Sequence, residues 1–308
     1  MLRTFFVRLS ENARLRNFAE RSSLGQRVSH RFVAGTEIDE AVHATQAINR
    51  ANMSVTIDNL GENVTNPDEA RHSAQLYRQI LEAIAAQRLN ANVSLKLTHM
   101  GLDVDEDLAG ELVGGLVAQA AAMNPPGFVR VDMEGSPYTQ RTLDFVHELH
   151  RRPGNANSVG TVIQAYLKRS ESDVEKLLAE GIRIRLCKGA YKEPPEIAFA
   201  QKSDVDANYV KLMKILLKSG IYHGLATHDE KMIREAQTFA TRENIARDSF
   251  EFQMLYGIRR DLQQSLVRAG WRMRIYIPFG TEWYPYFMRR LGERPANVFF
   301  IARNLLRA

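Results

Sequence analysis

Eight short runs rich in β-branched and other apolar residues recur along the chain, and a helical stretch follows each of them. The runs cover residues 53–60, 92–97, 127–134, 158–166, 182–191, 221–228, 249–255 and 271–280. The helical stretches cover 67–89, 105–122, 138–150, a segment starting near Ser172, 204–219, 229–242, 258–269 and 283–292. Strands separated by helices pair in parallel, and eight such units close into a barrel. The alternation therefore predicts an α/β protein with a (β/α)8 barrel.

The main alternative for the same alternation is an open, doubly wound sheet. No Gly-x-Gly-x-x-Gly motif follows any of the runs, so the dinucleotide fingerprint of that class is missing. No low-complexity linker divides the chain. We therefore expect an N-terminal helical extension over residues 1–45 and one catalytic barrel over residues 46–308.

The net charge of +5 is concentrated at the two ends of the chain. Residues 1–31 contain seven arginines and two glutamates, and residues 268–308 contain eight arginines and two glutamates, which leaves an acidic centre. A nucleic-acid groove across the domain would need basic clusters along the fold, so we expect no nucleic-acid partner.

The remaining composition indicates a cytoplasmic protein. The single cysteine, Cys187, excludes an internal disulfide and a cysteine-built zinc site, and it is expected to pack as a small apolar residue. No apolar stretch approaches the roughly 20 residues that span a bilayer, and the start lacks a secretory signal. Histidines are scattered without metal-binding spacing, so no metal site is expected.

Polar residues occupy the end of every predicted strand, which is where a barrel of this type carries its chemistry. These residues are Asp58, Lys96, Asp132, Gln164, Arg185 with Lys188, Thr227 with His228, Gln253 and Tyr276. One such residue alone would indicate a solvated loop. Polar residues at all eight ends instead predict a ligand site.

The charges at this end of the barrel favour an anionic ligand. Five cations, Lys96, Arg185, Lys188, Arg289 and Arg290, are expected to converge there against Asp132 and Glu293. Arginine and lysine pair with carboxylates and phosphates. The nearby aromatic residues Trp283, Tyr276 and Tyr286 are typical of a small-molecule pocket.

Six motifs in one order carry a family resemblance. RVDMEG, VIQAYL, RLCKGAY, FEFQMLYGI, RIYIPFG and YFMRRLGERPANV together resemble the proline dehydrogenase family over about residues 50–300. The resemblance implies a distorted TIM-type barrel of the compact, monofunctional bacterial kind. It also implies noncovalent FAD, oxidation of L-proline to Δ1-pyrroline-5-carboxylate by hydride transfer from proline C5 to flavin N5, and a membrane quinone as electron acceptor.

The same resemblance implies roles around the substrate. The expected catalytic residues are Lys96, Asp132, Arg185, Tyr276, Arg289 and Arg290. Lys96, Arg289 and Arg290 correspond to the clamp for the proline carboxylate, and Leu255, Tyr276 and Tyr286 to the residues that pack on its ring. Asp132 is expected to orient Lys96. Glu62 is expected to pair with Arg289 as a gate.

The resemblance further implies a set of cofactor contacts. These are Met133, Gln164, Arg185, Lys188, Gly189, Ala190, Tyr191, Thr227, His228, Gln253 and Glu293. Arg185 is expected beside flavin N5, and residues 188–191 around the phosphates and ribose. Asp229 departs from the family pattern, in which asparagine follows the histidine.

Three other interpretations stay open at this point. Lys96 or Lys188 would suit a Schiff-base aldolase, which forms its intermediate on a lysine. A non-catalytic anion-binding barrel and oxidation of hydroxyproline are also compatible with the residues. The sequence does not fix the oligomeric state. The basic N-terminal segment suits either peripheral association with the inner face of the cell membrane or packing on the barrel.

Overall fold

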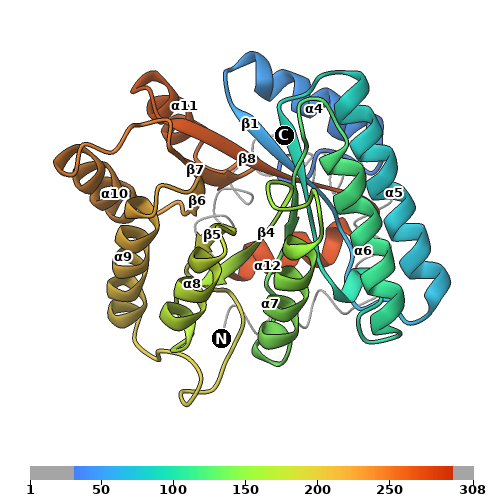
Figure 1. Ribbon diagram of the computed structural model, residues 1–308. Coiled ribbons are helices and arrows are strands. Elements are labelled where there is room, and N and C mark those ends of the chain that lie inside the picture. Colours follow the sequence, from blue (N-terminus) through green and yellow to red (C-terminus); the bar gives the residue numbers. More distant parts are fainter. Residues whose placement is uncertain (1–30, 294–308) are drawn as a thin grey trace.

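A computed structural model describes residues 31–293, with side chains as far as Met288. Eight parallel strands form a closed barrel in the order of the sequence, and helices surround it (Figure 1). The strands are β1 (Ser54–Asn59), β2 (Ala91–Leu95), β3 (Val129–Val131), β4 (Val159–Gln164), β5 (Arg183–Cys187), β6 (His223–Ala226), β7 (Phe250–Leu255) and β8 (Arg272–Phe279). The predicted (β/α)8 barrel is confirmed.

A helix follows each strand, as the sequence predicts. These helices are α5 (Pro67–Ala86), α6 (Glu106–Ala121), α7 (Ser136–Arg151), α8 (Ser170–Ala179), α9 (Lys202–Lys218), α10 (Glu230–Arg242), α11 (Arg260–Arg268) and α12 (Trp283–Glu293). Helix α4 (Ile38–Arg50) precedes the barrel, and a short 3-10 turn, η1 (Thr98–Met100), follows β2. Residue 45, the expected limit of the N-terminal extension, lies within α4.

Local capping explains where several helices begin. The side chain of Asn66 accepts hydrogen bonds from the backbone N–H groups of Asp68 (3.1 Å) and Glu69 (3.0 Å), and Pro67 occupies the first helical position of α5. An asparagine cap satisfies N–H groups that have no partner in the first turn, and proline there has no N–H to satisfy. Asp105 and Asp229 cap α6 and α10 in the same way.

Strand residues alternate between two different environments. In β1, Val55 and Ile57 are fully buried in the apolar layer between strands and helices, whereas Thr56 faces the other way and hydrogen-bonds Asn92 of β2. Alternation follows from the two-residue period of a strand. The barrel interior is therefore polar as well as buried.

Charged residues fill the part of this interior near the N-terminal ends of the strands. Arg274 Nε donates to Glu251 Oε1 at 2.6 Å, and the hydroxyl of Tyr222 donates to Glu251 Oε2 at 2.9 Å. Arg130 Nη1 donates to the carbonyl oxygens of Thr161 (2.9 Å) and Arg183 (2.7 Å). Buried charges of this kind require such partners because an unpaired one would be costly.

Predicted strands extend too far in some places. The run 182–191 forms a strand only as far as Cys187, because Gly189 has a φ of +107° and turns the chain away. The run 127–134 forms only three strand residues. In both cases the sequence pattern merged a strand with the polar loop that follows it.

The segment before α4 packs at the mouth of the barrel. Ala34 N donates to Pro278 O (2.9 Å), and Gly280 N donates to Gly35 O (3.0 Å), so this segment is bonded to the end of β8. Phe32 lies 5.9 Å from Phe287 of α12 between ring centroids. The basic residues 1–30, with their expected membrane or barrel contacts, lie outside the described part. Within residues 31–293, no helix is long and apolar enough to cross a membrane.

Candidate active site

One cavity of about 1270 Å³ opens at the C-terminal ends of the strands. It exceeds the roughly 300–1,000 Å³ typical of small-molecule sites. Its lining includes every residue with a predicted catalytic, substrate, cofactor or gate role whose side chain is described, namely Glu62, Lys96, Asp132, Met133, Gln164, Arg185, Lys188, Gly189, Ala190, Tyr191, Thr227, His228, Gln253, Leu255, Tyr276 and Tyr286. Trp283, expected as an aromatic of the pocket, is not among the lining residues and packs against Tyr284 and Phe287. Arg289, Arg290 and Glu293 belong to α12, but their side chains lie outside the described part, so the clamp and the gate stay predictions.

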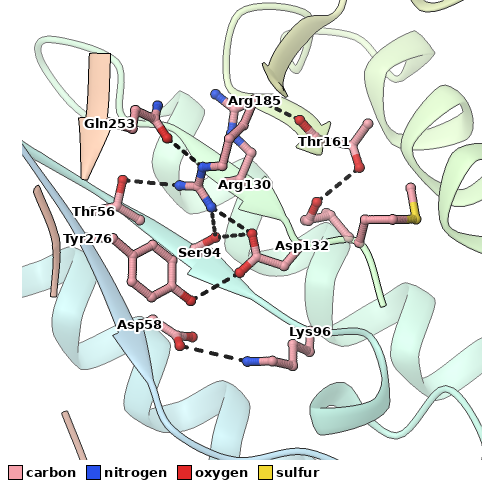
Figure 2. Close-up of polar contacts among 12 residues, drawn as sticks. Thr56, Asp58, Ser94, Lys96, Arg130, Asp132, Thr161, Arg185, Gln253 and Tyr276 are labelled. Atoms are coloured by element: carbon pink, nitrogen blue, oxygen red, sulfur yellow. Dashed lines mark hydrogen bonds and ion pairs between the residues drawn. The ribbon is translucent and has the colours of Figure 1, made fainter. Parts of the chain in front are cut away.

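Arg185 is held at the centre of the barrel by several strands (Figure 2). Its Nη1 donates to Asp132 Oδ1 at 2.7 Å and to Ser94 Oγ at 3.1 Å, and its Nε donates to Gln253 Oε1 at 2.6 Å. The guanidinium also lies 5.2 Å from the ring centroid of Tyr276. A cation fixed in advance can stabilise negative charge without reorganising.

The amide of Gln253 has a single orientation. Its Nε2 donates to Glu251 Oε1 at 2.7 Å, while its Oε1 accepts from Arg185. A carboxylate only accepts hydrogen bonds and a guanidinium only donates them, so a flipped amide would satisfy neither neighbour. Glu251 thus connects Arg274, near the N-terminal ends of the strands, through Gln253 to Arg185 at the cavity.

Asp132 is the acceptor for three donors around the cavity. Besides Arg185, it accepts from Ser94 Oγ at 2.7 Å and from the hydroxyl of Tyr276 at 3.1 Å (Figure 2). The sequence predicts that Asp132 orients Lys96; the charge of Asp132 does act on Lys96, but the direct ion-pair partner of Lys96 is Asp58. Lys96 Nζ lies 3.7 Å from Asp58 Oδ2, because Asp58 lies near the end of β1 and Lys96 directly follows the neighbouring strand β2.

The charge states in this group are set by burial and by neighbouring carboxylates. Burial lowers the pKa of Lys96, but the carboxylates of Asp58 and Asp132 outweigh it and hold that pKa above its ordinary value. Burial and then the charge of Asp132 raise the pKa of Tyr276 well above its ordinary value. At neutral pH, Lys96 is therefore a cation and Tyr276 a neutral hydrogen-bond donor.

Gln164 presents an unused acceptor. Its Nε2 donates to the carbonyl oxygens of Glu134 (2.9 Å) and Met133 (3.3 Å). Its Oε1 is buried and has no partner within the described part of the chain. A buried polar atom without a partner is costly, so this oxygen fits a ligand that brings a donor, such as the ring N–H of a flavin.

Lys188 lies between two carboxylates in the wall of the cavity. Its Nζ contacts Asp206 Oδ1 at 2.5 Å and Asp229 Oδ2 at 2.7 Å. Asp229 also caps α10 by accepting from Lys231 N at 3.0 Å. The departure from the family's asparagine therefore has a structural role here, as a helix cap and as a partner for Lys188.

The loop after β5 approaches other residues closely. A Cβ on Gly189 would lie 2.2 Å from the ring of Tyr166, and the φ of +107° also disfavours any other residue. Across the mouth, His228 Nε2 accepts from Leu255 N at 3.0 Å, which assigns the ring proton to Nδ1. Cys187 packs against the core as expected, and burial raises the pKa of its thiol to about 12.

The expected excess of cations is not seen among the described lining residues. The charged lining residues are Lys96, Arg185, Lys188 and Lys202 against Asp58, Glu62, Asp68, Glu69, Asp132, Asp229 and Glu282. The prediction considered mainly the residues at the strand ends, and it did not include the carboxylates that loops and helix starts contribute to the cavity. Within the described chain, no three His, Cys, Asp or Glu side chains gather as a metal site.

Two contributors to the site were not assigned roles from sequence. Asp58 was recognised only as a polar strand end, and Ser94 was not singled out. The signal for Ser94 is its position two residues before Lys96, since residues two apart on a strand face the same side.

Comparison with protein-family models matches residues 41–303 to the model described as proline dehydrogenase. The chain belongs to the proline dehydrogenase family. It is 41% identical to "Proline dehydrogenase 2" of Bacillus subtilis (strain 168) over 304 residues, which cover 98% of each chain. It is also 41% identical to "Proline dehydrogenase" of Deinococcus radiodurans over 283 residues, covering 91% of this chain and 90% of that one.

Longer relatives and a solved structure give the same family and fold. "Bifunctional protein PutA" of Escherichia coli (strain K12) is 26% identical over an alignment of 317 residues that covers 90% of this chain and 24% of PutA. The crystal structure of PutA from Bdellovibrio bacteriovorus inactivated by N-propargylglycine superposes with a TM-score of 0.81 at 27% identity. The match covers 87% of this proline dehydrogenase family member and 32% of that PutA chain.

Proposed function

We propose that this protein oxidises L-proline to Δ1-pyrroline-5-carboxylate with FAD as cofactor and passes the electrons to a quinone. The observation that carries the proposal is the arrangement around Asp132 in a member of the proline dehydrogenase family. There, a charged lysine, a fixed arginine and a neutral tyrosine face one large cavity at the mouth of a barrel.

The substrate half of the cavity suits a small amino acid with a carboxylate. Lys96 supplies a permanent cation, and α12 carries Arg289 and Arg290 beside the mouth. Planar guanidinium groups bind carboxylates through two parallel hydrogen bonds. Tyr276, Tyr286 and Leu255 supply an apolar wall for the ring. The protein's task is to hold the substrate in a reactive orientation.

The remaining cavity residues fit FAD. Gln164 offers an acceptor for a ring N–H, Arg185 offers a fixed cation for the electron-rich reduced ring, and the loop 188–191 lines the same cavity. When bound, the flavin supplies the two-electron redox chemistry that no protein side chain provides. The cavity volume also leaves room for a dinucleotide together with a small substrate.

A Schiff-base aldolase is disfavoured by the state of Lys96. Such an enzyme needs a lysine whose pKa is depressed, so that the free amine attacks a carbonyl. The pKa of Lys96 is raised by Asp58 and Asp132, and Lys188 lies against two carboxylates. Borohydride treatment with a keto acid should leave no trapped adduct on either lysine.

An anaerobic absorbance spectrum tests cofactor and substrate together. The purified protein should show flavin absorbance that bleaches on addition of L-proline. A colourless protein that fails to bind added FAD, or a flavin that proline leaves oxidised, would contradict the proposal. Hydroxyproline in a parallel sample measures preference within the family, and reoxidation of the bleached protein by a soluble quinone analogue tests the acceptor.

Substitution of Arg290 separates substrate binding from cofactor binding. Arg290→Met should raise the KM for proline at least about tenfold, because the variant loses one charge-assisted pair with the proline carboxylate. The FAD content should stay unchanged. Arg268→Met is the matched control, because Arg268 is exposed on the outer helix α11. Equal losses of proline and FAD binding in Arg290→Met would argue against the clamp.

A further inference from the structure

Glu193 connects two loops at the mouth of the barrel. It lies in the loop between β5 and α9, and its carboxylate reaches Ser136, the first residue of α7. Ser136 N donates to Glu193 Oε1 at 2.8 Å, and Ser136 Oγ donates to Glu193 Oε2 at 2.5 Å. The hydroxyl of Tyr166, which follows β4, lies 3.4 Å from the same Oε1. Loops after three strands therefore meet at one carboxylate.

Helix α7 lacks a cap of its own. Its N-cap residue is Gly135, which has no side chain to accept from the first-turn N–H groups, and Pro137 follows at the second helical position. Glu193 supplies the missing acceptor from a different part of the chain. A carboxylate at this position also interacts favourably with the positive end of the helix dipole.

The loop that Glu193 holds includes part of the cavity wall. Gly189, Ala190 and Tyr191 line the cavity directly before Glu193. After it, the loop is fixed again where Lys168 N donates to Ile197 O at 3.0 Å and Phe199 N donates to Tyr166 O at 2.8 Å. Glu193 is thus the side chain that ties the middle of the loop to a helix.

We propose that Glu193 is a positioning residue for the cofactor. By capping α7 from the β5–α9 loop, it keeps the start of this loop, residues 188–190, in the conformation that lines the cavity beside the proposed cofactor. Its effect is on the affinity for FAD and not on the oxidation of proline once FAD is bound. The inference rests on the proposed function, because it takes FAD as the ligand.

Three variants test this role in the full chain. Glu193→Ala removes the cap and should weaken FAD binding to the apoprotein about tenfold, the size expected for losing one helix cap. Glu193→Gln keeps an oxygen that can accept from Ser136 N, so it should stay within about threefold of wild type. Glu196→Ala, three residues further along the same loop and exposed, should change nothing.

Kinetic measurements distinguish positioning from a general loss of structure. At saturating FAD, the kcat and the KM for proline of Glu193→Ala should match wild type. An unchanged FAD affinity in Glu193→Ala would overturn the proposal, and so would a kcat that stays low when FAD is saturating. If Glu193→Ala does not fold, Ser136→Ala removes only the hydroxyl contact and should weaken FAD binding by a smaller factor; no weakening would equally overturn it.

Hydrogen exchange supplies a readout that does not depend on catalysis. In the apoprotein, Glu193→Ala should accelerate amide exchange in residues 188–195 and at the start of α7, while exchange in β5 stays as in wild type. Unchanged exchange in these two segments would contradict the cap. If wild type fails to bind FAD, the proposed function fails, whereas the exchange result still decides whether Glu193 holds the loop.

Discussion

Gly224 and Gln253 lie against each other inside the barrel: a Cβ on Gly224 would come within 2.2 Å of Gln253 Nε2 and 2.7 Å of its Cδ. Gly224 is also the register partner of both Arg185 on β5 and Glu251 on β7. The missing side chain at position 224 therefore makes the space in which Gln253 links these two charged residues.

Gly224→Ala should disturb the site without touching any charged residue. The new methyl group displaces the Gln253 amide, and Arg185 loses its 2.6 Å partner at Nε. We expect kcat to fall roughly tenfold to a hundredfold, since small displacements near a reacting centre have effects of this size, with a smaller change in the KM for proline. Steady-state assays with a dye acceptor measure both. In a Gln253→Ala background, Gly224→Ala should have little further effect; full additivity would contradict the link.

Alanine substitutions at two other glycines should change the free energy of unfolding in opposite directions. A Cβ on Gly160 in β4 would lie 2.3 Å from the backbone oxygen of Arg183, whereas Gly110 in α6 has nothing within 4 Å. Gly160→Ala should lower the free energy of unfolding by more than about 2 kcal/mol, because a backbone clash cannot relax cheaply. Gly110→Ala should raise it by about 0.5–1 kcal/mol through helix propensity. Denaturant titrations compare the two, and equal effects would contradict the geometry.

Tyr77→Phe and Tyr209→Phe form a matched pair of hydroxyl deletions. The hydroxyl of Tyr77 lies 2.7 Å from Ser94 O and 3.1 Å from Asp58 Oδ1, whereas the buried hydroxyl of Tyr209 has no partner in the described part of the chain. Losing the first leaves buried acceptors unsatisfied and should cost about 1–3 kcal/mol of stability. Losing the second should be neutral or slightly stabilising. Thermal and denaturant unfolding decide, and a reversed order would be inconsistent with these contacts.

Stability should fall below neutral pH, in part because of His99. Burial, followed by the charge of Lys96, lowers the pKa of His99 from 6.5 to about 4. Between these values the unfolded chain binds a proton that the folded chain does not, so acid favours unfolding. The loss from this residue is about 2 kcal/mol between pH 7.5 and pH 5. His223, whose pKa burial lowers to about 3, adds to the same trend.

The pH dependence of unfolding in a variant isolates the contribution of His99. His99→Phe should flatten the decline between pH 7.5 and pH 5, as measured by denaturant titration at each pH. His43→Phe, at an exposed position in α4, should keep the wild-type slope. An unchanged slope in His99→Phe would show that this residue is not the source.

Local sequence patterns predicted the barrel because they determine the elements that build it. The run of alternating residues in β1 and the Asn66-Pro67 start of α5 are each set within a few residues. Polar strand ends predicted the cavity because parallel strands bring those ends together. Local patterns did not predict which side chains contact one another within the site. Whether Lys96 meets Asp58 or Asp132 depends on side-chain reach across the mouth, and Glu193 caps a helix 57 residues away in sequence.

The bonds from Ala34 and Gly35 to the end of β8 also determine how this protein can be attached to anything else. Because the described chain begins on the rim of the barrel beside α12, residues 31–35 lie on the side where the cavity opens. A label or a surface coupled at residue 31 would therefore sit next to the entrance, and one coupled through a side chain at the closed base would leave that entrance clear. Immobilisation for assays of substrate access should use the base.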